Sequence, residues 1–175
     1  MQIGDSARLS YHYVTEADSE FLWQLDQDER VMRFINGGRK STREEIEQVF
    51  VPRSQAYSNQ PLGWGLWRIR VVATQQDIGW ILVRPFGFFT QHPEIDNIEL
   101  GWRFCHDSWG NGYATEAAKQ VKEALYRSGI DTFSAIANPD NTASINIMKK
   151  LGMTFSHEFD YKDSVYQETV VVYAT

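Results

Sequence analysis

The sequence has little of several residue classes, and each shortage excludes a kind of protein. Cys105 is its single cysteine among 175 residues, so an internal disulfide is excluded. It holds no apolar run of membrane-spanning length, and its first residues lack a basic region followed by an apolar block. We therefore expect a globular protein with no transmembrane helix, no secretory signal and no membrane partner, located in the cytoplasm.

Positive charge is also scarce. Seventeen Lys and Arg residues face 23 Asp and Glu residues, which gives a formal net charge of -6. Nucleic-acid binding by phosphate neutralisation needs a basic surface, so no nucleic-acid partner is predicted. The four histidines, at positions 12, 92, 106 and 157, lack the spacing of metal ligands, and no metal is predicted.

Aromatic residues are numerous, with six Trp, eight Tyr and ten Phe. Most are expected in the core and on sheet faces, and some in a pocket. A chain of this length, with 42% hydrophobic residues, can bury one core of its own. Because no repeat or linker divides it, we expect a single domain over residues 1–175.

The most informative stretch is residues 97–128, which reads as a strand, a glycine turn and a helix. One strand face is apolar, and the other carries Glu99 and Arg103 beside Gly101. Gly110 and Gly112 then break the pattern, and small and aliphatic residues recur at helical spacing. Two glycines before a helix admit a ligand close to the backbone, where free amides and the helix dipole favour a phosphate or pyrophosphate. Such turns are also common as plain connections.

Periodicity and capping residues predict the other elements. Strands are expected at residues 9–13, 67–71, 78–83, 98–104, 133–137, 155–161 and 165–173. One helix uses residues 21–25, a second opens at Ser41 or Thr42 and ends before Pro52, and the last runs from Asn141 or Thr142 to Leu151. Gly129 is placed to end the central helix, and Gly152 to end the last one. The aromatic stretch 84–93 is expected to be a loop that serves as a lid, a dimer contact or packing.

This order of elements, with the segments GWRFCHDSWGNGYATEA and NPDNTASINIMKKLGM, resembles the GNAT superfamily of N-acetyltransferases over essentially the whole chain. The opening segment resembles the RimJ/RimL type. The resemblance implies a mixed α/β (α+β) fold, with a mostly antiparallel sheet of six or seven strands flanked by four helices. It also implies acetyl-CoA as cosubstrate and an amine, either a protein N-terminus or a small molecule, as acceptor, and it allows a homodimer.

The resemblance further implies which residues hold acetyl-CoA. In the superfamily, backbone amides of the turn before the central helix bind the pyrophosphate. The matching turn here consists of Trp109, Gly110, Asn111, Gly112, Tyr113 and Ala114, with Trp109 where Arg or Gln is usual. Asn141 and Ser144 match an Asn-x-x-Ser pattern whose Asn contacts the pantetheine arm. Phe104 and Cys105 end the strand along which that arm lies in the family.

The chemistry requires an unprotonated amine. Freeing the lone pair of a lysine-like amine at neutral pH costs about 4 to 5 kcal/mol, against about 1 kcal/mol for a chain α-amine. Glu99 is the candidate base, because it lies on the open strand face and resembles a carboxylate with that role in some family members. The alternative is a surface ion pair of Glu99 with Arg103 or Arg70.

The amine would attack the thioester directly, with no covalent enzyme intermediate. Many superfamily members protonate the departing thiolate with a Tyr, but Met148 stands at that position here. Ser144 is then the candidate donor, and the alternative is that it caps the helix start. Cys105 is not expected to carry the acyl group, because nothing provides a matching His with Asn or Asp. The rival function is a non-catalytic acyl-CoA-binding sensor or interaction module.

Overall fold

The computed structural model describes residues 1–163 and 167–175. Within these residues a seven-stranded sheet runs in the order β1-β2-β3-β4-β5-β7-β6. Neighbouring strands are antiparallel except β4 and β5, which are parallel. The predicted mixed fold is confirmed. The strands are β1 (Leu9–Tyr13), β2 (Gly65–Val71), β3 (Asp77–Phe86), β4 (Glu94–Phe104), β5 (Thr132–Ala137), β6 (Thr154–Lys162) and β7 (Gln167–Ala174).

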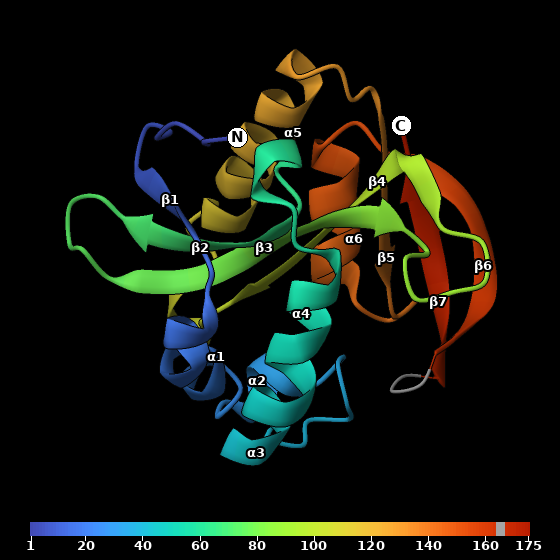
Figure 1. The fold of residues 1–175 in the computed structure, drawn as a ribbon. Helices are drawn as coiled ribbons and strands as arrows, with labels where there is room; N and C mark the ends of the chain where they lie inside the picture. Colours follow the sequence, from blue (N-terminus) through green and yellow to red (C-terminus); the bar gives the residue numbers. More distant parts are fainter. Residues whose placement is uncertain (164–166) are drawn as a thin grey trace.

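Helices cover both faces of the sheet. Helices α5 (Tyr113–Arg127) and α6 (Thr142–Lys150) lie on one side, and α1 (Ser19–Leu25), α2 (Glu29–Met32), α3 (Arg43–Glu45) and α4 (Val51–Tyr57) on the other (Figure 1). A large hydrophobic cluster joins the sheet to α5 and α6, and a smaller one lies under the N-terminal helices. In the described residues, no helix is long and apolar enough to cross a membrane.

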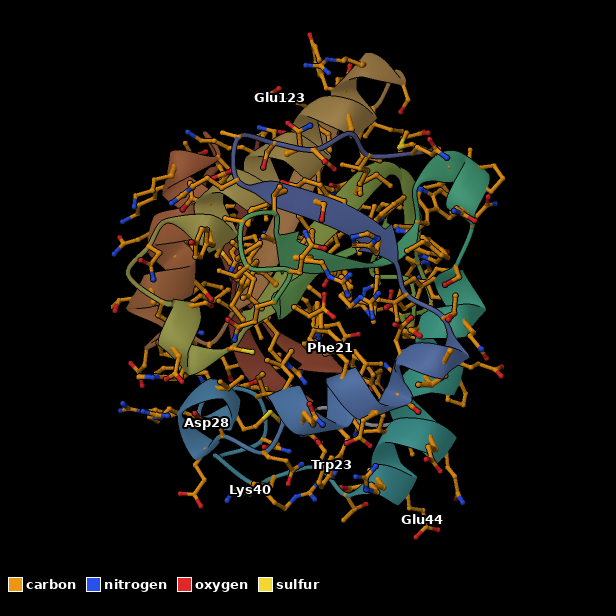
Figure 2. The ribbon with its side chains drawn as sticks, turned by 90° about the vertical axis from the view of Figure 1, so that its left-hand side faces the viewer. Phe21, Trp23, Asp28, Lys40, Glu44 and Glu123 are labelled. Carbon is orange, nitrogen blue, oxygen red and sulfur yellow. The ribbon has the colours of Figure 1, made fainter. Side chains whose placement is uncertain are left out.

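The short helix α1 shows how the smaller cluster forms. Leu22 and Leu25 are buried, and Phe21 points from α1 toward the sheet (Figure 2). Trp23 is partly buried and also packs against this cluster. The Arg43 guanidinium stacks 3.8 Å from the centre of the Trp23 ring. An amphipathic first helix was predicted, but the separate short helix α2 after it was not.

The predicted end of the second helix before Pro52 is wrong. Thr42 and Glu45 form the expected capping box, with the Glu45 amide donating to Thr42 Oγ1 at 3.1 Å. A π-helical segment, Ile46–Phe50, then leads directly into α4, so the helical path continues to Tyr57. Proline disrupts a regular α-helix because it lacks an N–H and clashes with the preceding turn, and here Pro52 directly follows a π-helical turn in place of an α-helical one.

The aromatic stretch 84–93 is only partly a loop, which corrects the prediction. Strand β3 continues through Phe86 and β4 already begins at Glu94, so the loop is residues 87–93. A shift of register between Pro85 and Phe86 accommodates the proline, which cannot donate to a neighbouring strand. As a result Arg84 is a sheet residue with a fixed partner across the ladder.

Both long helices of the second half end at glycines, as predicted. Gly129 and Gly152 have φ of 100° and 80°, a left-handed conformation that suits glycine. The Met153 amide donates to the Met148 carbonyl at 3.1 Å, which closes the end of α6. The last strand was expected to start at Val165, which lies outside the described residues together with the turn residue Ser164.

Candidate active site

Strands β4 and β5 pair over three residues only, in the middle of β4 and at the beginning of β5. The pairs are Asn97 with Thr132, Ile98 with Phe133, and Glu99 with Ser134. Beyond Glu99, β4 stays paired with β3, and β5 stays paired with β7. The two strands therefore separate, and we call this separation the fork. Along residues 100–103, the edge of β4 that faces the fork has no strand partner in the described chain, so an extended polar ligand can pair with it.

The glycine turn at the far end of β4 carries a run of free amides. The backbone N–H groups of residues 110–115 have no acceptor among the described residues. The first hydrogen bond joins the Glu116 amide to the Gly112 carbonyl at 3.0 Å. Gly110 and Gly112 have φ of 77° and 76°, which other residues adopt with strain. Consecutive free amides at the start of the 15-residue helix α5 make an anion site.

The side chains of the turn hold its shape. The Trp109 indole N–H donates to the Phe104 carbonyl at 2.9 Å, and its ring lies 4.8 Å from the His106 ring. Asn111 donates from its side-chain amide to the carbonyls of Ser108 and Trp109 at 3.2 and 3.1 Å. Trp109 thus fixes the end of β4 and supplies no positive charge to the turn.

A cation reaches the turn from another element. Arg8, just before β1, donates from Nη1 to the Asn111 carbonyl at 3.0 Å and forms an ion pair of 2.6 Å with Glu116. Although burial raises the pKa of Glu116, hydrogen bonds from Ser6 and Arg8 lower it overall. No local pattern indicates a role for Arg8, because more than a hundred residues separate it from Asn111 and Glu116.

The start of α6 lies beside the fork. The Trp102 indole N–H of β4 donates to Ser144 Oγ at 3.2 Å, and Asn141 Oδ1 accepts from the Ser144 amide at 3.2 Å. Of the two predicted caps, Asn141 is therefore the one that caps α6. The alternative role of Ser144 as the cap is wrong, and its hydroxyl proton stays available to donate. Trp102 was predicted only as an apolar face residue.

Glu99 is the charged residue at the fork, and only 4% of it is exposed. Its two carboxylate oxygens each accept a hydrogen bond of 2.9 Å from Arg84 on β3. The predicted alternative of a surface pair with Arg103 or Arg70 is wrong, since Arg103 pairs with Asp26 and Arg70 with Asp77. Sequence analysis missed Arg84 because it was assigned to the loop.

Arg84 is itself enclosed. Its guanidinium lies 5.7 Å from the Tyr57 ring of α4 and 5.5 Å from the Phe89 ring of the loop. Burial lowers the pKa of Arg84, but the charge and hydrogen bonds of Glu99 outweigh it and raise the pKa overall. Arg84 therefore remains charged and holds the Glu99 carboxylate in one orientation.

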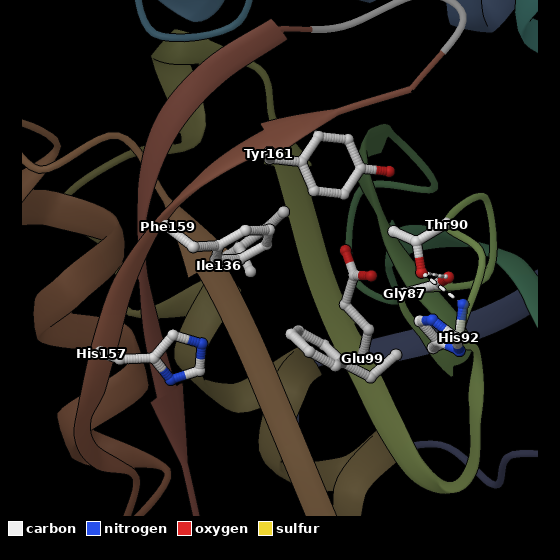
Figure 3. Close-up of a pocket in the computed structure, with 9 residues that line it drawn as sticks. Gly87, Thr90, His92, Glu99, Ile136, His157, Phe159 and Tyr161 are labelled. Atoms are coloured by element: carbon white, nitrogen blue, oxygen red, sulfur yellow. Dashed lines mark hydrogen bonds between the residues drawn. The ribbon is translucent and has the colours of Figure 1, made fainter.

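A cavity of about 140 Å³ opens over Glu99 on the sheet face that α1 to α4 cover (Figure 3). The Glu99 carboxylate points from β4 toward Tyr161 on β6. The remaining walls come from the ends of β3 and β5, from β6 and from the loop 87–93. They include Phe86, Ile136, His157 and Phe159.

The Tyr161 wall is tied to α4. Its hydroxyl donates to Asp163 Oδ2 at 2.8 Å, and Arg53 of α4 donates to the same oxygen at 2.7 Å. Burial, followed by the bond to Asp163, raises the pKa of Tyr161, so the phenol stays protonated. The Arg53 guanidinium also stacks 3.8 Å from the Phe89 ring. These contacts join α4, the loop and β6 around one cavity.

Cys105 lies half-buried where β4 ends, and its amide donates to the Ile78 carbonyl at 2.8 Å. Burial raises the pKa of its thiol, so it is a weak nucleophile. Phe104 beside it is buried in the large cluster. Among the described residues no cluster of His, Cys, Asp and Glu is arranged to hold a metal ion.

A comparison with known families assigns this arrangement. Residues 8–154 match the model of the acetyltransferase (GNAT) domain. The chain belongs to the GNAT acetyltransferase family. The predicted family and fold are confirmed, and the prediction of an acetyl-CoA-dependent N-acetyltransferase is confirmed at the level of the family.

Individual GNAT relatives agree with this assignment. The chain is 30% identical over 158 residues to FsC-acetyl coenzyme A-N(2)-transacetylase of Aspergillus fumigatus, covering 88% of this chain and 66% of that enzyme. A GNAT acetyltransferase structure from Bacillus anthracis superposes with a TM-score of 0.76 at 22% identity, covering 100% of this chain and 98% of that one. The structure of RimL, the ribosomal L7/L12 α-N-protein acetyltransferase in complex with coenzyme A, superposes with a TM-score of 0.75 at 16% identity. The match covers 100% of this chain and 97% of that one.

Proposed function

We propose that the protein transfers the acetyl group of acetyl-CoA to a primary amine, by direct attack of the amine on the thioester. One observation carries the proposal: Glu99 lies both at the fork and in the cavity. From this point the open edge of β4 runs toward the free amides of the glycine turn. An amine in the cavity and a thioester along β4 would thus meet at one carboxylate.

Two parts of acetyl-CoA, the diphosphate and the pantetheine arm, have candidate residues. The amides of residues 110–115, in the turn built from Trp109, Gly110, Asn111, Gly112, Tyr113 and Ala114, would hold the diphosphate. The edge of β4 down to Phe104 and Cys105 would pair with the pantetheine amides, and the Asn141 side chain would add a contact to that arm. From Glu99 to Phe104 an extended strand spans roughly 16 Å, a length suited to that arm.

Glu99 would take the proton that the amine loses, directly or through one water, as the new C–N bond forms. Backbone amides of β4 at the fork would stabilise the negative oxygen. As the C–S bond breaks, the Ser144 hydroxyl would donate a hydrogen bond to the sulfur, which departs as a thiolate stabilised by that bond. The hydrogen bond that Ser144 accepts from Trp102 strengthens it as a donor.

The acceptor class, a protein N-terminus or a small-molecule amine, belongs to this proposal. So do the RimJ/RimL type, a cytoplasmic location, a homodimer and a single domain over residues 1–175. A sensor or interaction module that binds acyl-CoA without turnover is less favoured. Such a module has no need of a carboxylate fixed between the fork and a cavity.

Release of the CoA thiol from acetyl-CoA tests the proposal. The purified protein is mixed with N-terminal peptides, polyamines, aminoglycosides or small monoamines, each compared with a blank without amine. We expect release above the blank with at least one class, and acetylated product in equal amount by mass spectrometry. Acetyl-CoA binding with no release from any amine would contradict the proposal and favour the sensor.

A further inference from the structure

We infer that the acceptor is a monoamine with an aromatic or large apolar group near its nitrogen, and not a polycation. The inference rests on the proposed function, since it takes the cavity over Glu99 as the acceptor site. Its basis is the pairing of every carboxylate that faces the cavity in the described residues, and the apolar character of the walls.

The walls are mostly rings and hydrocarbon. Ile136, Phe159 and Tyr161 lie around the Glu99 carboxylate (Figure 3). Phe86 also lines the cavity. The Phe159 and Tyr161 rings pack edge to face, with centres 5.9 Å apart. Apolar walls stabilise a ligand in proportion to the apolar area it buries, and aromatic rings pack well against another ring. Thr90, His92 and His157 are the other polar residues of the lining, so a hydrophilic chain finds few partners there.

The carboxylates at the cavity already form ion pairs with arginines. Glu99 is paired with Arg84, and Asp163 behind Tyr161 is paired with Arg53. Glu158 and Asp160 alternate with the cavity residues along β6, so they lie on its other face. Residues 164–166 are Ser, Val and Tyr, so they add no carboxylate to this count. A second or third ammonium group would therefore enter the cavity without a counter-charge.

Glu99 retains capacity for one amine. A carboxylate has about four acceptor positions, and Arg84 occupies one on each oxygen. The remaining positions can accept from a single nitrogen at the fork. The volume, about 140 Å³, is below the roughly 300 to 1,000 Å³ of sites for drug-sized ligands. Both facts favour one small amine with one apolar group.

The test compares acceptors and two matched variants at saturating acetyl-CoA. Steady-state kinetics are measured for 2-phenylethylamine, ethylamine, spermidine and kanamycin. Phe159→Ala removes a cavity wall. Phe155→Ala is the control, because Phe155 lies on the same strand, is 54% exposed and packs on Tyr173 outside the cavity.

We expect kcat/KM for 2-phenylethylamine to exceed that for spermidine and kanamycin by about tenfold or more. Phe159→Ala should lower kcat/KM for 2-phenylethylamine about tenfold, mainly by raising KM. The kcat/KM for ethylamine should change less than about twofold. Phe155→Ala should leave kcat/KM unchanged for both 2-phenylethylamine and ethylamine. A preference for spermidine or kanamycin, or equal effects of the two variants, would overturn the inference and leave acetyl transfer intact.

If no amine is acetylated, the proposed function has failed, and binding decides the inference separately. Calorimetry with CoA present then compares 2-phenylethylamine with spermidine. Tighter binding of 2-phenylethylamine that is weakened by Phe159→Ala would support the apolar acceptor site. Equal binding of both amines, or no binding, would overturn it.

Discussion

Arg84 and Glu99 lie directly opposite each other on β3 and β4 and share two hydrogen bonds of 2.9 Å. Both side chains are largely buried, with 11% and 6% exposed. A carboxylate held through both oxygens cannot rotate, so its free lone pairs keep fixed directions. The pair thereby places one acceptor of hydrogen bonds at the point where β4 and β5 separate.

Removing one member of this pair should destabilise the fold strongly. Arg84→Ala leaves Glu99 buried without its partner, and we expect the free energy of unfolding to fall by about 3 to 5 kcal/mol in urea titrations. Arg70→Ala is the control, because Arg70 makes the same two-bonded contact with Asp77 but in a more exposed place. Arg70→Ala should lower the free energy of unfolding by about 1 kcal/mol or less. Equal losses would contradict the account of Arg84.

The glycine turn should bind acetyl-CoA through its conformation. Gly112→Ala forces a side chain into a left-handed backbone, and we expect the Kd for acetyl-CoA to rise about tenfold, equivalent to losing one amide contact. Gly129→Ala is the matched control at the other end of α5, where φ is also positive. The melting temperatures of Gly112→Ala and Gly129→Ala should fall by similar amounts. An unchanged Kd in Gly112→Ala would argue against the turn as the anion site.

Ser144 should act on turnover rather than on binding. Ser144→Ala removes the donor at the fork, and we expect kcat to fall on the order of tenfold, a modest effect because a thiolate leaves readily. Trp102→Phe removes the indole hydrogen bond together with part of the ring, keeps the Ser144 hydroxyl, and should lower kcat less. Ser128→Ala, at the far end of α5, is the control. Stopped-flow measurement of CoA release separates these effects, and a raised KM at constant kcat would show that Ser144 only positions the cosubstrate.

Cys105 should be an unreactive thiol. Burial raises its pKa, so a smaller fraction is thiolate at any pH below that value than in free cysteine. At pH 8 we expect iodoacetamide to modify the folded protein at least about tenfold more slowly than the protein unfolded in guanidinium. Cys105→Ala should keep its kcat. Fast labelling together with loss of activity would revive Cys105 as an acyl carrier.

Local patterns predicted most of the fold. The alternation of residues 98–104, the two glycines before α5 and the glycine ends of both long helices each depend on a few neighbouring residues. Capping by Thr42 and Glu45 is equally local. The errors arose where tertiary packing outweighed a local rule, as when the helical path continued through Pro52 and β3 continued through Pro85.

The site was predictable in position but not in its contacts. Glu99 and the glycine turn are visible because strand, turn and helix follow one another in sequence. Arg84 could be recognised as the partner of Glu99 only from the register of β3 and β4, and Arg8 reaches the turn from the other end of the chain. Such contacts between distant segments have no periodic signal in a single sequence.

The most direct test of the account is the kcat of Glu99→Gln with the best amine, measured beside the Kd for acetyl-CoA. Glu94→Gln is the control, because Glu94 begins the same strand but is exposed. We expect Glu99→Gln to lower kcat by about 10² or more at pH 7 and to leave the Kd for acetyl-CoA unchanged. Glu94→Gln should leave both kcat and Kd unchanged. A Glu99→Gln protein that binds acetyl-CoA normally and turns over at the wild-type rate would contradict it.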